Sequence, residues 1–172
     1  NFLSLKDELM DSGVEFNSET DSEVLAHLVG NAVASGNSLR EAVIGAASRI
    51  RGNTAVVAVS AAEPGVVVGL RVGNAGGIVV GKNDSAAVMA SDTIALLPYT
   101  NEVIYLEPGE VVEIERGEVR LFNLEGSVIE RDAAVTPQNF AAAQKGNHPH
   151  FMSKEIAEQP DAIQGSLRGR AD

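Results

Sequence analysis

The chain has 172 residues, 44% hydrophobic and 22% charged, which predicts a water-soluble globular domain with a core of its own. Thirteen basic and 24 acidic side chains give a formal net charge of −11, which argues against nucleic acid or a membrane surface as partner because both are polyanions. No cysteine is present, so the chain offers no disulfide, no thiolate metal ligand and no thiol nucleophile. That absence is compatible with a cytoplasmic location.

The ends and the apolar segments add three expectations. No apolar stretch is long enough to span a bilayer, because charged residues interrupt every candidate. The first seven residues lack the basic and apolar regions of a secretion signal. Since the chain begins with Asn rather than Met, we expect it to be a piece of a longer product.

The first fifty residues are predicted to form helices. A short apolar face over residues 3–10 gives the first. Thr20 and Glu23 have the spacing of a capping box and precede apolar residues at helical intervals, and Ser38 and Glu41 repeat this arrangement. Two further helices are therefore expected, each opened by a capping box.

From residue 53 onward the period changes to two, which predicts β-strands separated by Gly- and Pro-containing turns. Ser91 is expected to cap a short helix that continues to Leu97 and is stopped by Pro98. Residues 137–145 are expected to add a brief helix. The expected strands are 54–60, 66–72, 78–80, 86–90, 103–106, 111–115, 119–123 and 127–130, and the last four are expected to form one meander.

Helices followed by antiparallel strands, without strict β-α-β alternation, predict an α+β protein built from layered sheets. Composition and periodicity do not identify its function. Three short runs of sequence do more. The most informative contains KEIAEQP at residues 154–160, which mixes charged, apolar and helix-stopping residues in an order that no generic amphipathic helix requires.

The three runs are SETDSEVLAHL at residues 18–28, ASDTIALLP at 90–98 and HPHFMSKEIAEQP at 148–160. In this order they resemble the glutamine–fructose-6-phosphate aminotransferase family. The last resembles the connector between that family's glutaminase and sugar-isomerase domains. The resemblance therefore implies a partial glutaminase domain over residues 1–146 and an interdomain connector over residues 147–172.

The resemblance implies an N-terminal-nucleophile fold, a four-layer α/β/β/α sandwich of two antiparallel sheets. This chain is expected to be incomplete at its N-terminal side, because the strand that carries the cysteine nucleophile is not among these residues. We therefore expect an exposed sheet edge or a partly empty core, and marginal stability.

Asp21 is the principal candidate site residue. An acidic residue in the first turn of a helix ordinarily complements the helix dipole and its free amides. In the family that the chain resembles, the matching Asp binds the α-amino group of substrate glutamine, so the resemblance gives Asp21 that role. His27, on the same predicted helix, is interpreted as a packed or half-exposed residue because no Ser or Cys nucleophile can be paired with it.

The other polar features have plainer interpretations. His148 and His150 have no third metal-ligand signal and are interpreted as connector contacts. The glycines of residues 73–77 do not fit a phosphate loop and predict a turn, at a place where the family has Gly-Ser-Pro. Asp92 is interpreted as a helix-start residue, and Glu155 and Glu158 as a solvated helix face. No metal or cofactor is expected.

The resemblance implies an enzyme that forms glucosamine 6-phosphate and glutamate from fructose 6-phosphate and glutamine. There an N-terminal Cys attacks the glutamine amide, fructose 6-phosphate binds to an isomerase domain that is absent here, and the full-length enzyme is a homodimer. The chain alone is expected to hydrolyse no glutamine. Two alternatives remain: another class II amidotransferase, forming phosphoribosylamine or asparagine, whose domain junctions differ, and a non-catalytic interaction module.

Overall fold

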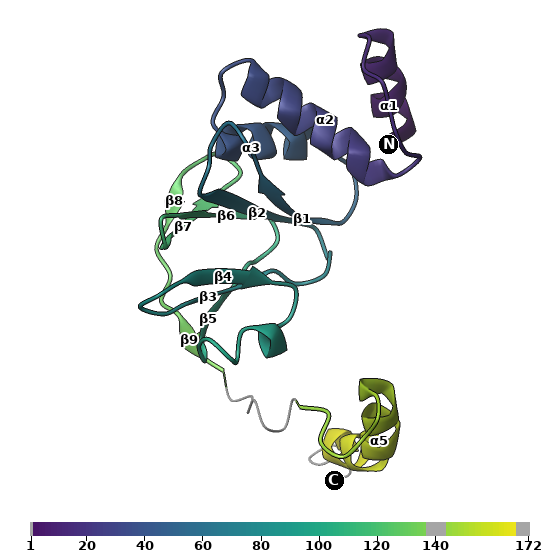
Figure 1. The fold of residues 1–172 in the computed structure, drawn as a ribbon, viewed down its shortest axis with the longest axis vertical. Coiled ribbons are helices and arrows are strands. Elements are labelled where there is room, and N and C mark those ends of the chain that lie inside the picture. Colours follow the sequence, from purple (N-terminus) through teal and green to yellow (C-terminus); the bar gives the residue numbers. More distant parts are fainter. Residues whose placement is uncertain (1, 137–143, 168–172) are drawn as a thin grey trace. The chain divides into compact units, whose positions relative to one another are not determined.

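A computed structural model describes residues 2–136 and 144–167 (Figure 1). The described residues form two compact units, one before residue 137 and one after it. Most of the brief helix predicted at 137–145 lies outside the described residues. The functional boundary predicted after residue 146 stays a prediction.

The first unit begins with the three predicted helices, α1 (Phe2–Asp11), α2 (Asp21–Ala34) and α3 (Leu39–Arg49). Their apolar faces meet in one cluster, because side chains three and four residues apart share a helix face. That cluster contains Leu5 and Leu9 of α1, Val24 and Leu28 of α2, and Ala46 of α3.

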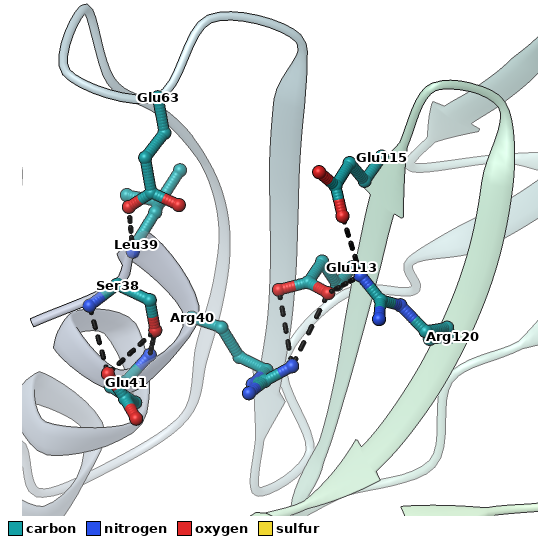
Figure 2. Close-up of polar contacts among 8 residues, drawn as sticks. All are labelled: Ser38, Leu39, Arg40, Glu41, Glu63, Glu113, Glu115 and Arg120. Atoms are coloured by element: carbon teal, nitrogen blue, oxygen red, sulfur yellow. Dashed lines mark hydrogen bonds and ion pairs between the residues drawn. The ribbon is translucent and has the colours of Figure 1, made fainter.

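The predicted capping box of α3 is confirmed (Figure 2). The Glu41 carboxylate accepts hydrogen bonds from the Ser38 amide at 2.9 Å and the Ser38 hydroxyl at 2.8 Å, and the Glu41 amide donates back to that hydroxyl. The Glu63 carboxylate accepts from the Leu39 amide. These bonds satisfy the amides of Ser38, Leu39 and Glu41, which have no partner within the helix.

The capping box predicted at α2 is wrong. Thr20 occupies the cap position, but its side chain accepts no amide bond there. Glu23 reaches beyond Thr20 to the amides of Asn17 and Ser18, at 2.6 and 2.7 Å. The Thr20 hydroxyl lies 2.9 Å from the Ser18 hydroxyl instead. The segment before α2 thus places the amides of Asn17 and Ser18 against the Glu23 carboxylate.

The strands form two antiparallel sheets. The larger has the order β1 (Thr54–Val59), β2 (Val66–Val72), β6 (Glu110–Glu115), β7 (Glu118–Asn123), β8 (Val128–Ile129). The smaller has the order β4 (Ala87–Ala90), β3 (Val79–Lys82), β5 (Glu102–Tyr105), β9 (Ala134–Val135).

Three details of the prediction need correction. The strand at 103–106 does not belong to the meander: β5 pairs with β3 in the smaller sheet, with Val80 opposite Ile104. The strand β9, which pairs with β5, was not predicted. The short helix is the 3-10 turn η1 (Thr93–Ala95), and its cap is Asp92 rather than Ser91, because the Asp92 carboxylate accepts from the Ile94 amide at 2.8 Å.

In this unit α2 and α3 cover one face of the larger sheet, and the smaller sheet packs on the other (Figure 1). Alternation along the strands places Val68, Leu70, Val111 and Phe122 against α3. Val80, Val112, Ile114 and Leu121 lie between the sheets. On the outer face of the smaller sheet, Leu96 packs on Val79 and Val103. Two packed antiparallel sheets with helices outside confirm the α+β fold, with one helical layer in the described unit.

The two sheets approach closely where β2 faces β4. A Cβ atom built on Gly69 of β2 would lie 2.5 Å from the Met89 sulfur and 2.8 Å from Val112 Cγ1. These separations are shorter than real carbon contacts, so any larger residue at this position would force the Met89 and Val112 side chains to shift. Met89 therefore packs directly on the backbone of the opposite sheet.

One side of this sandwich is open. β4 lies opposite β2, while β1 is the free edge of the larger sheet. On the face of β1 that alternates away from the helices, Val57 and Val59 are 54% and 73% exposed. A groove of about 530 Å³ is lined by residues of α2, α3 and β1. The structure thus has an exposed sheet edge, one of the two features expected from the sequence.

The second unit contains the helix α5 (Phe151–Leu167), which includes Pro160 and has no buried residue. Glu155 and Glu158 are exposed on it, and Glu158 lies 3.6 Å from Lys154, which confirms the solvated face. Across the described ranges of both units, no helix is long and apolar enough to cross a membrane.

Candidate functional site

Asp21 lies on the wall of a cavity of about 340 Å³. It is the first residue of α2, so its side chain projects from the start of the helix. Phe2 and Leu5 of α1 form a second wall, and the segment entering β1, with Arg51 and Asn53, forms a third. Two helices and a strand therefore bring one carboxylate and one guanidinium to the same cavity.

The Asn53 wall is fixed by the glycine-rich turn. The Asn74 amide donates to Asn53 Oδ1 at 2.9 Å, and a Cβ atom on Gly73 would lie 2.3 Å from the same oxygen. Gly73 has φ +63°, a conformation that L side chains rarely adopt. The glycines at 73–77 thus begin with a tight turn, as predicted, and that turn supports the cavity.

Near Asp21 in the sequence, the Glu23 carboxylate binds the backbone of the segment that precedes α2. It accepts from the amides of Asn17 and Ser18, and His27 Nε2 lies 3.5 Å from it. The bond from the Asn17 amide is the main reason why the pKa of Glu23 falls from 4.5 to about 2, with the Ser18 hydroxyl adding to it. This carboxylate stays ionised well below neutral pH.

His27 is a packed residue, as predicted. Its ring meets Phe16 edge-on with centroids 4.7 Å apart, and its side chain is 28% exposed. It lies on α2, where its ring contacts Phe16 and its Nε2 lies near Glu23. It does not line the Asp21 cavity. Its contacts are those of a residue that supports the segment before the helix.

The other sequence-derived candidates lie elsewhere. Asp92 caps η1, and His148 and His150 lie in the second unit. Within residues 2–136 and 144–167, no three His, Asp or Glu side chains stand close enough together to hold a metal ion. Sequence reasoning missed Arg51 and Asn53, because neither lies in a recognisable motif and only the fold brings them beside Asp21.

A larger cavity, of about 890 Å³, lies at the opposite end of the strands. Lys82 of β3 and Glu118 of β7 line it, and their side chains pair at 3.2 Å across the two sheets. It contains none of the residues singled out in the sequence.

The fold defines a class of protein. The allosteric regulatory enzyme of purine biosynthesis superimposes with a TM-score of 0.58 at 26% identity, over 72% of this chain and 26% of that one. The glutamine phosphoribosylpyrophosphate amidotransferase from B. subtilis gives a TM-score of 0.58 at 22% identity, over 80% of this chain and 32% of that one. The fold is that of the N-terminal-nucleophile amidotransferases.

Sequence relatives narrow the class to a family, although no family model matches the chain. Glutamine–fructose-6-phosphate aminotransferases from Aquifex aeolicus and Mesorhizobium japonicum are each 38% identical, over 98% and 100% of this chain. One from Rhizobium meliloti is 38% identical over 95%. The chain belongs to this family, and it spans 26% to 28% of the length of these relatives.

Proposed function

We propose that the chain forms part of the glutaminase domain of an enzyme that makes glucosamine 6-phosphate and glutamate from fructose 6-phosphate and glutamine. In this proposal Asp21 binds the α-ammonium group of glutamine. The observation that carries it is the position of Asp21, at the first residue of α2 and on the wall of the 340 Å³ cavity. The names of the relatives give glutamine and fructose 6-phosphate as reactants.

The chemistry of the cavity suits an amino acid. An ammonium and a carboxylate form charge-assisted hydrogen bonds, which are shorter and stronger than neutral ones. Arg51 lines the same cavity and supplies a positive charge near which an α-carboxylate can lie. Both charges of a free amino acid therefore have counterparts on the cavity wall.

The remaining parts of the reaction belong to residues outside this chain. The family uses a cysteine as nucleophile. These 172 residues contain no cysteine, so another part of the enzyme supplies it. Fructose 6-phosphate binds to a sugar-isomerase domain that follows the connector, and the whole enzyme is a cytoplasmic homodimer. The chain alone binds glutamine without hydrolysing it.

The test is calorimetric titration of the 172-residue chain with L-glutamine. Asp21→Asn keeps the shape of the side chain and removes its charge, so binding should weaken by about tenfold or more. Asp92→Asn, at the start of η1, is the matched control and should leave the affinity unchanged. Equal affinity in Asp21→Asn and the parent chain would contradict the proposal, as would ammonia release from glutamine by the chain alone.

A second candidate is a phosphoribosylamine-forming amidotransferase, because two solved structures share the fold and one of them is a glutamine phosphoribosylpyrophosphate amidotransferase. Their identities of 22% and 26% are lower than the 38% of the aminotransferases, and they cover less of the chain. The coding sequence downstream distinguishes the two, since a sugar-isomerase domain supports the first proposal and a phosphoribosyltransferase domain the second.

A further inference from the structure

We infer that Glu23 is a positioning residue for the Asp21 site: it holds the segment before α2 so that the Asp21 carboxylate faces the cavity. This inference rests on the proposed function, because it concerns how the same glutamine-binding carboxylate is oriented. Glu23 touches no substrate in this scheme. It acts through the backbone of residues 17–20.

The Glu23 carboxylate has several polar partners, and its side chain is only 15% exposed. Oε1 accepts from the Asn17 amide at 2.6 Å, and Oε2 accepts from the Ser18 amide at 2.7 Å and from the Ser18 hydroxyl. His27 Nε2 lies 3.5 Å from Oε1. Four groups from three residues thus converge on one side chain, and two of them are backbone amides that fix the path of the chain.

The same segment is tied to α1. The Lys6 ammonium donates to the Ser18 carbonyl at 3.2 Å and lies 4.8 Å from the centre of the Phe16 ring. Phe16 in turn packs on His27. Because α1 and the start of α2 are two walls of the cavity, these contacts set the walls relative to each other.

The effect of Glu23 should be local. Asp21 lies two residues before Glu23, and only Glu19 and Thr20 separate it from the residues that Glu23 holds. The bonded atoms are exposed, and exposed contacts contribute little to global stability. Their loss therefore changes the order of this segment more than the stability of the fold.

The test compares Glu23→Gln with Glu41→Gln. Glu41 occupies the same position in α3 and bonds the Ser38 amide and hydroxyl (Figure 2). It lies far along the chain from Asp21 and does not line its cavity. The probes are L-glutamine and glutaramic acid, which is the same molecule without the α-amino group. Calorimetry gives the affinity of each variant for each probe.

In the parent chain L-glutamine should bind more tightly than glutaramic acid. Glu23→Gln should lower the affinity for L-glutamine by roughly tenfold and leave that for glutaramic acid nearly unchanged, because only the ammonium contact depends on Asp21. Glu41→Gln should keep the preference of the parent. By NMR, the amides of Asn17 and Ser18 should exchange with solvent faster in Glu23→Gln.

Any one of the following results overturns the inference. Unchanged L-glutamine affinity in Glu23→Gln does so while leaving the proposed function intact. An equal loss for both probes, or an equal loss in Glu41→Gln, shows a general effect on folding instead. A parent chain with no preference for L-glutamine defeats the proposed function itself, and unchanged amide exchange in Glu23→Gln then shows separately that Glu23 does not hold the segment.

Discussion

Glu23 and Glu41 occupy the same position in consecutive helices, yet they have different partners. Both follow a hydroxyl residue by three positions, so the sequence predicts a capping box at each. Glu41 forms it with Ser38, whereas Glu23 passes Thr20 and bonds the amides of Asn17 and Ser18. Spacing predicts which residues can form a cap, but the path of the preceding loop decides which amides are presented.

The lowered pKa of Glu23 makes part of the stability pH-dependent. Its pKa is about 2 in the folded chain, against an ordinary value of 4.5, because the Asn17 amide and Ser18 bond the ionised form. The stabilisation is complete above the unfolded pKa and is lost as the pH falls toward 2.

We therefore expect the parent chain to be slightly more stable than Glu23→Gln near neutral pH, by a small margin because the contacts of Glu23 are exposed, and that margin to vanish between pH 4.5 and about 2. Urea midpoints for both proteins across this range provide the measurement. A constant difference at every pH would show that the carboxylate has no such role.

At the scale of the element, the two helix starts differ in their dependence on the cap residue. Ser38→Ala removes a hydroxyl that accepts an amide bond and donates to Glu41. It should lower the free energy of unfolding by about 1 kcal/mol.

Thr20→Ala is the counterpart, because the Thr20 side chain caps no amide. It should cost less than about half as much as Ser38→Ala in the same urea titration. Equal costs would mean that the hydroxyl of Thr20 does cap α2 in solution.

The helices and most strands were predictable because their apolar periods are local properties of the sequence. The partner of each strand was not: β5 leaves the meander for β3, more than twenty residues away, and no local pattern encodes that pairing. Asp92 and Ser91 are both good caps, so the sequence did not distinguish them. β9 has only two residues, too few for a periodic signal.

The candidate site was predictable in part. Asp21 was found through the motif in which it lies, and it does line a cavity. Arg51 and Asn53 were not found, since they approach Asp21 only when the end of α3 and the start of β1 fold beside α2. Glu23 was identified as a cap, and its actual contacts depend on a loop without regular structure.

At the scale of the whole molecule, the open side of the sandwich determines how the chain is expected to associate with itself. The exposed β1 edge carries the run TAVVAV, with no charge and no proline. Native edges are usually protected by charges, bulges or covering segments, because bare backbone groups pair with other strands. We therefore expect this chain to associate through β1 at high concentration.

Val57→Lys and Val59→Lys should suppress that association, as measured by sedimentation or light scattering. Each should change the free energy of unfolding by less than about 0.5 kcal/mol, because both side chains are largely exposed. Val68→Lys, at a fully buried position of β2, is the contrasting substitution and should prevent folding. Undiminished association in the two edge variants would show that the chain associates through a surface other than β1.

The contact between Met89 and Gly69 makes the packing of the two sheets against each other sensitive to oxidants. A sulfoxide adds a polar oxygen to a sulfur atom that already lies too close to the opposite backbone for a methyl group to fit between them. Mild peroxide should therefore loosen the sandwich in proportion to the Met89 sulfoxide seen by peptide mass spectrometry, and Met89→Leu should resist. Methionine sulfoxide reductase should restore the parent chain, which would make this damage repairable.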